Sequence, residues 1–236
     1  MKTKMTFIAL FVSAAILLSG CKALTGGLIG GGAGAAIGAG LGALIGKDGK
    51  SAAIGAAIGG AVGATTGSII GNKMDKAAAE AAAIEGAKVE TVTDANNLKA
   101  VKVTFDSGIL FASGSSTLTA TSKTALAKFA NIMKDNATME IKIVGYTDNA
   151  GWANSTAEQS KAKNKTLSEQ RATSVSNYLK TQGVAATQIA DVLGAGEDFP
   201  VADNSTKAGQ QQNRRVEVYI YASEQMIKDA EKEAQQ

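Results

Sequence analysis

The chain has 236 residues, of which 45% are hydrophobic and 19% are charged, with a formal net charge of +3, one cysteine and no histidine. Nucleic-acid binding needs a concentrated basic footprint, which this composition does not provide. The absence of histidine also removes the most common zinc ligand and the base of a Ser-His-Asp triad. We therefore expect no metal, no cofactor and no catalytic residue.

The N-terminus has the pattern of a secretion signal. Lys2 and Lys4 precede an uncharged run that ends at Gly20. This run is shorter than the roughly 20 apolar residues of a membrane-spanning helix, so we predict a signal peptide over 1–20. Its removal takes two lysines and no acidic residue, which lowers the formal charge from +3 to +1.

The only cysteine, Cys21, closes the sequence "LSGC" (18–21). This sequence resembles the bacterial lipobox, in which the cysteine becomes the lipid-modified first residue of the mature chain. Several acyl chains such as palmitate, at about 0.8 kcal/mol per buried CH2 group, give a stable anchor. Lys22 stands where inner-membrane retention usually requires Asp, so we expect residues 21–25 to be the lipidated N-terminus at the outer membrane. The alternative is a small buried cysteine.

Two charge-free segments of 21 residues, 26–46 and 51–71, carry glycine at every fourth position and flank the polar sequence "KDGK". This period places the glycines on one side of a helix about 30 Å long, close to the thickness of a bilayer core. Because each interior glycine costs roughly 1 kcal/mol relative to alanine, such a helix needs close packing on another backbone. We predict a glycine-zipper helical hairpin over 26–71 that forms transmembrane helices or a homo-oligomer. A flexible Gly/Ala spacer is the alternative.

The rest of the chain has the periodicity of a globular domain. Residues 72–90 are expected to form an Ala-rich helix and linker, and residues 223–236 a C-terminal tail. Between them, over 91–222, the alternation of apolar residues predicts a hairpin at about 89–105, a strand at 138–146 and a last strand at 214–221. Helices are predicted at 119–136 and 167–182, with a polar loop from 147 to about 164. This order predicts an α/β (α+β) sandwich with helices packed on one sheet.

Two charged residues suggest a binding site. Asp148 follows a central strand, where α/β sheets often bind ligands. Arg171 shares a helical ridge with the apolar Leu167 and Val175, near the expected start of its helix. A carboxylate, a guanidinium and free helix N–H groups suit a zwitterionic ligand. The residues alone leave open a second interpretation, in which Asp148 and Arg171 form a structural ion pair.

Four motifs extend this interpretation: "GYTDNAG" (145–151), "NKTLSEQRATSV" (164–175), "LGAGEDFPVADNST" (193–206) and "NRRVEV" (213–218). In this order they resemble the peptidoglycan-binding domain of the OmpA family, over roughly 100–222. With the glycine repeat, the chain resembles the YiaD-like outer-membrane lipoproteins. The resemblance implies a mixed sheet and non-covalent binding of diaminopimelate, with Asp148 and Arg171 holding its zwitterionic end. It also places Asn164 at the site and makes Arg214 and Arg215 mainly structural.

The chain departs from the family at three places. The segment "WANSTAEQSKAK" (152–163) lengthens the loop after Asp148 and is expected to form a rim, with Trp152 as a wall. Ala112 replaces a common acidic residue, and Gln210 replaces a common arginine.

The sequence thus predicts an outer-membrane lipoprotein with a periplasmic domain that binds peptidoglycan and tethers the membrane to the cell wall. One alternative is a glycine-zipper oligomer with an envelope assembly or pore role. Another is an enzyme acting on peptidoglycan through Asp148 or Glu169, for which the sequence offers no second carboxylate of defined geometry.

Overall fold

The computed structural model describes residues 63–94 and 98–236. The predicted signal peptide, Cys21 and residues 26–62 of the predicted hairpin lie outside this part of the chain, so those expectations remain predictions. Within the described residues, no helix combines the length and the apolar character needed to cross a bilayer.

The described residues fold around a five-stranded sheet with the order β1-β2-β5-β3-β4. Only β3 and β4 are parallel, and the other neighbouring pairs are antiparallel, so the sheet is mixed, as expected. The strands are β1 (Ala87–Thr93), β2 (Lys99–Asp106), β3 (Met139–Tyr146), β4 (Ile189–Gly196) and β5 (Arg215–Ala222).

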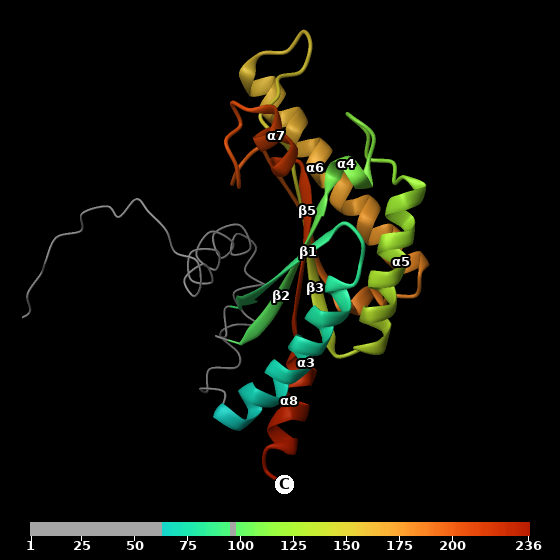
Figure 1. The fold of residues 1–236 in the computed structure, drawn as a ribbon, viewed down its shortest axis with the longest axis vertical. Helices are drawn as coiled ribbons and strands as arrows, with labels where there is room; N and C mark the ends of the chain where they lie inside the picture. The colour runs from blue at the N-terminus through green and yellow to red at the C-terminus, as the bar shows by residue number, and fades with distance from the viewer. Residues whose placement is uncertain (1–62, 95–97) are drawn as a thin grey trace, which may run out of the picture. The chain divides into compact units, whose positions relative to one another are not determined.

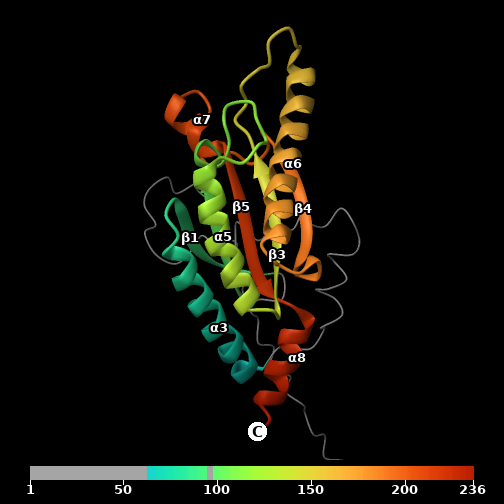
Figure 2. The ribbon, with the colours of Figure 1, turned by 90° about the vertical axis from the view of Figure 1, so that its right-hand side faces the viewer.

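Helices α3, α5 and α6 pack on one face of this sheet (Figures 1 and 2). Val216, Val218 and Ile220 of β5 point to this side and are fully buried, as their alternation predicted. The helices are α3 (Ala64–Ala82), α4 (Ser107–Leu110), α5 (Ala120–Asp135), α6 (Ala157–Thr181), α7 (Lys207–Asn213) and α8 (Glu224–Glu233), with a 3-10 turn η1 (Ala186–Gln188).

Helix α3 differs from the expected organisation. It begins at Ala64, inside the segment assigned to the zipper hairpin, and it packs on the sheet domain instead of linking to it. Ile70, Met74, Ala77 and Ala81 are fully buried in the main core, because they form one apolar stripe at helical spacing. Strand β1 likewise begins before the expected boundary at residue 91. Residues 64–90 therefore contribute a helix and a strand to the domain.

The C-terminal tail forms helix α8 and docks beside α3 (Figure 1). Met226, Ile227 and Ala230 are buried there. Ser223 caps the helix, since its Oγ accepts a hydrogen bond of 3.1 Å from the backbone N–H of Met226.

Helix α6 begins well before the predicted start at residue 167. Thr156 and Gln159 form a capping box: Thr156 Oγ1 accepts from the Gln159 N–H at 3.2 Å, and Gln159 Oε1 accepts from the Thr156 N–H at 2.9 Å. The segment expected to be a loop thus supplies the first turns of α6. Arg171 lies in the middle of the helix, so the expected contribution of free helix N–H groups is wrong, because those groups are at the far end.

Candidate functional site

A cleft of about 710 Å³ lies where β2 and β3 end and β5 begins. Helices α4 and α7, which contribute residues to its lining, lie toward the end of the domain away from α8 (Figure 1). This is the edge of the sheet at which Asp148 was expected to act. The cleft is lined by Ser107, Gly108, Phe111, Ala112, Ser113, Gly114, Thr147, Asp148, Ala150, Gly151, Trp152, Ala153, Asn164, Leu167, Arg171, Lys207, Gln210 and Arg214.

Two glycines bring α6 close enough to the sheet to place its residues over this edge. A Cβ on Gly145 of β3 would lie 2.1 Å from the backbone oxygen of Ser168. A Cβ on Gly194 of β4 would lie 2.4 Å from the backbone nitrogen of Glu169. No side chain fits at either position, so the backbone of α6 rests directly on β3 and β4.

Asp148 is 7% exposed at the wall of the cleft. Its Oδ1 accepts from the Ala150 N–H at 3.2 Å, and its Oδ2 accepts from Arg214 Nη1 at 2.5 Å. The structural ion pair that the sequence left open, between Asp148 and Arg171, is absent from the described residues. Asp148 is paired with a different arginine.

Arg171 is 3% exposed and its Nε donates to the backbone oxygen of Ser115 at 3.0 Å. The guanidinium carbon lies 5.2 Å from the centre of the Phe111 ring. Burial lowers the pKa of Arg171, and so does the neighbouring Arg214, while Asp148 opposes them. Within the described residues Arg171 forms no ion pair, and a buried guanidinium without a carboxylate is costly. The arrangement suits a carboxylate supplied by a ligand.

Asn164 lies beside these charges and is 3% exposed. Its Oδ1 accepts from Trp152 Nε1 at 2.7 Å, and its Nδ2 donates to Ala150 O at 3.2 Å and to Glu197 Oε2 at 3.0 Å. Because these contacts use both ends of the amide, Asn164 holds the loop after β3 in place.

Arg214 lines the cleft, although the resemblance implied a mainly structural role for it. Arg215 does have that role, since it pairs with Glu217 at 2.8 Å and its guanidinium carbon lies 3.7 Å from the centre of the Tyr146 ring. The strand predicted at 214–221 would place Arg214 and Arg215 on opposite sides of the sheet. This alternation was the available signal that the two arginines could not share one role.

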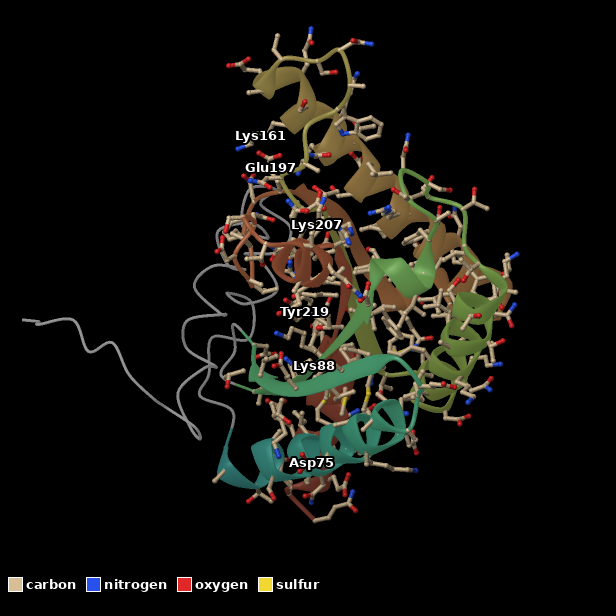
Figure 3. The ribbon with its side chains drawn as sticks, turned by 45° about the horizontal axis from the view of Figure 1, so that its top comes forward. Asp75, Lys88, Lys161, Glu197, Lys207 and Tyr219 are labelled. Atoms are coloured by element: carbon tan, nitrogen blue, oxygen red, sulfur yellow. The ribbon has the colours of Figure 1, made fainter. Side chains whose placement is uncertain are left out.

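Lys207 of α7 also lines the cleft. Figure 3 shows it toward the same end of the domain as Lys161 and Glu197, away from Asp75 on α3. With Arg171 and Arg214, the cleft holds three cationic side chains and one carboxylate, Asp148. Its charge favours a ligand that carries carboxylates.

Two residues with hydroxyl groups, Ser107 and Thr147, also line the cleft. Ser107 is 1% exposed and Thr147 is 4% exposed. Neither Ser107 Oγ nor Thr147 Oγ1 has a hydrogen-bond partner within the described part of the chain. Ala112 and Gln210 line the same cleft and leave it without the charges that the resemblance implies there.

Comparisons with known proteins agree with this architecture. The OmpA family model matches residues 110–214, and the YMGG-like Gly-zipper model matches residues 1–75. The chain is 38% identical to the probable lipoprotein YiaD of Escherichia coli, over 48% of this chain and 47% of that protein. It is 34% identical to the outer-membrane lipoprotein YfiB of Pseudomonas aeruginosa, over 49% of this chain and 64% of that protein. It is 40% identical to the peptidoglycan-binding protein ArfA of Mycobacterium tuberculosis, over 40% of this chain and 26% of that protein.

Two solved structures share the fold. A putative MotB-like protein from Desulfovibrio vulgaris superposes with a TM-score of 0.53 at 23% identity, covering 66% of this chain and 91% of that one. The cell wall anchor of the T6SS from Pseudomonas aeruginosa gives a TM-score of 0.51 at 24% identity, covering 64% of this chain and 97% of that one. Sequence and fold agree, and residues 110–214 of this chain form an OmpA family domain.

Proposed function

We propose that this chain is an outer-membrane lipoprotein whose OmpA family domain binds peptidoglycan non-covalently and tethers the membrane to the cell wall. In this proposal a signal peptide over 1–20 is removed and Cys21 carries the lipid. The glycine-zipper segment follows, and the domain lies in the periplasm. The proposal is supported by relatives that are named lipoproteins and by one that is named peptidoglycan-binding.

The observation that carries the proposal is the buried Arg171 at the cleft, which forms no ion pair within the described residues. Diaminopimelate presents a carboxylate and an ammonium at the free end of its side chain. The carboxylate would bind the planar guanidinium of Arg171 through two hydrogen bonds. The ammonium would bind Asp148, which can accept beyond its contact with Arg214, because an ionised carboxylate has about four acceptor positions.

Asn164 has a different role in this proposal. Its amide is already bonded on both sides, to Trp152 and to Ala150 and Glu197. We assign it to the position of the loop that carries Asp148 instead of to the ligand itself.

The positions of the start of α3 and of the cleft suit a protein that tethers a membrane to the cell wall. The first residues of α3 lie at one end of the domain, and α7, which contributes residues to the cleft, lies at the other (Figures 1 and 2). A connection toward the membrane at the start of α3 leaves the cleft free to face the cell wall.

The test is co-sedimentation of the full-length protein, purified in detergent, with isolated sacculi. The protein should sediment with sacculi and be released by soluble diaminopimelate. Nα-acetyl-lysine amide, whose side chain ends in an ammonium without a carboxylate, should release it poorly. Equal release by both compounds, or no sedimentation, would contradict the proposal.

A further inference from the structure

We propose that Trp152 forms a second subsite beside the charged cleft, which packs against a sugar ring of the glycan strand. The inference rests on the proposed function and extends it from the stem peptide to the saccharide. It assigns a role to a segment that departs from the OmpA family, residues 152–163.

Trp152 is the only tryptophan of the chain and lines the cleft, half-buried. Its backbone N–H donates to Ser160 Oγ at 3.0 Å, and its indole Nε1 donates to Asn164 Oδ1 at 2.7 Å. Both ends of the residue are therefore fixed. Because the indole N–H is already bonded within the protein, the ring offers a ligand its apolar surface and π face.

The ring is held in the same framework as the charged site. Asn164 receives the indole N–H and donates through Nδ2 to Ala150 O at 3.2 Å, while Asp148 Oδ1 accepts from the Ala150 N–H at 3.2 Å. The positions of the ring and of the carboxylate are thus coupled through two residues. A ligand that reaches both would meet a preorganised surface, which reduces the entropy lost on binding.

The early turns of α6 support this arrangement. Ser160 belongs to them and bonds Trp152 directly. Lys163 Nζ lies 5.8 Å from the centre of the indole ring and donates to Ser155 Oγ at 2.8 Å. Asn154 adopts a left-handed φ of 54° in the turn between Trp152 and the start of α6. The inserted segment therefore has a defined structure, which keeps the tryptophan at the cleft.

The chemistry of peptidoglycan identifies the ligand for this ring. A pyranose has a face of C–H groups that packs on aromatic rings, as other apolar surfaces do. Diaminopimelate lies a few residues from the sugar to which the stem peptide is joined. A cleft of about 710 Å³ exceeds the space that one charged amino-acid end requires, so the ligand can extend from Asp148 and Arg171 to Trp152.

Since the chain has one tryptophan, its fluorescence reports on this residue alone. The full-length protein should be titrated with a disaccharide tetrapeptide that contains diaminopimelate, and with the same tetrapeptide without sugars. The sugar-bearing ligand should shift the emission and bind about 3- to 10-fold more tightly, the range expected for one aromatic contact. Equal affinities, or the same emission change with the free peptide, would overturn the subsite while leaving the proposed function intact. Binding of neither ligand would overturn both.

Two variants separate the ring from its hydrogen bond. Trp152→Phe and Trp152→Leu both lose the indole N–H that bonds Asn164, but only the phenylalanine keeps an aromatic face. Measured by calorimetry, Trp152→Phe should retain most of the preference for the sugar-bearing ligand, and Trp152→Leu should bind both ligands equally. Retention of the preference by Trp152→Leu would exclude sugar packing. Asp148→Ala should weaken both ligands by the same factor, which distinguishes the charged site from the subsite.

Discussion

Arg171 and Asp148 lie at the same cleft but have different partners. Arg171 is bonded to the protein through Nε, whereas Asp148 is paired with Arg214. If a ligand zwitterion joins them, Asp148→Ala and Arg171→Ala each leave a ligand charge unmatched. Arg171→Lys keeps the positive charge but loses the forked contact to the ligand carboxylate. We expect each alanine variant to weaken sacculus binding about 30-fold or more, from a cost of about 2–5 kcal/mol, and we expect Arg171→Lys to weaken it as well.

A matched control lies on the same helix. Glu169 is exposed and does not line the cleft. Glu169→Gln should therefore bind sacculi as the unchanged protein does. Unaltered binding by folded Asp148→Ala and Arg171→Ala would remove both residues from the site.

Glycine substitutions test how the site is positioned. At Gly145 a methyl group would lie 2.1 Å from the Ser168 oxygen, so α6 must move away from β3. Gly145→Ala should cost about 1–3 kcal/mol or more of unfolding free energy and weaken ligand binding, since Arg171 moves with α6. At Gly67 of α3 a methyl group meets nothing within 4 Å, so Gly67→Ala should add about 1 kcal/mol through helix propensity. Urea denaturation measures both changes in unfolding free energy. Changes of the same sign would show that the close contact at Gly145 does not limit the side chain there.

At the scale of elements, helix α3 is part of the domain core. Ile70 and Met74 are fully buried, and each such side chain contributes about 1.5–3 kcal/mol. A protein that starts at residue 87 should therefore unfold at a much lower urea concentration than one that starts at residue 63. The loss is large beside the roughly 5–15 kcal/mol total stability of a domain. Equal urea midpoints for the two proteins would show that the packing of α3 does not stabilise the domain.

Strands β1 and β2 are joined by a pH-dependent ion pair. Lys102 is 8% exposed and binds Glu90, its register partner on β1. The hydrogen bond from Lys102 lowers the pKa of Glu90, with burial opposing it. A lowered folded-state pKa stabilises the fold above the ordinary carboxyl pKa, and this stabilisation is lost as the pH falls through the folded-state value.

Glu90→Gln should therefore lower the melting temperature at pH 7, and the difference from the unchanged protein should shrink below about pH 4. Glu233→Gln, at the exposed end of α8, serves as the control. A difference in melting temperature that stays constant with pH would show that the ion pair between Lys102 and Glu90 does not cause it.

At the scale of the whole molecule, attachment depends on one side chain. If Cys21 carries the lipid, Cys21→Ser removes the thiol that is acylated, and the chain should remain an unprocessed or mislocalised precursor. Membrane fractionation and the N-terminal sequence of the product measure this. An outer-membrane protein cut after Gly20 despite the substitution would refute lipidation at Cys21.

Local periodicity was enough to predict several elements. The strand at 138–146, the helix at 119–136 and the last strand at 214–221 agree with β3, α5 and β5 to within one residue at each end. The burial pattern of a strand or helix repeats along the chain, so neighbouring residues contain the signal. The same pattern placed Asp148 after a strand and Arg171 on the buried side of a helix.

The partners of these charges were decided by the tertiary structure. Asp148 pairs with Arg214, which is 66 residues away, because β3 and β5 are neighbours in the sheet. The burial of α3, and the bond between Trp152 and Asn164, likewise depend on which elements pack together. A periodic pattern shows which side of an element is buried, but the group that meets it there is set by contacts between distant parts of the chain.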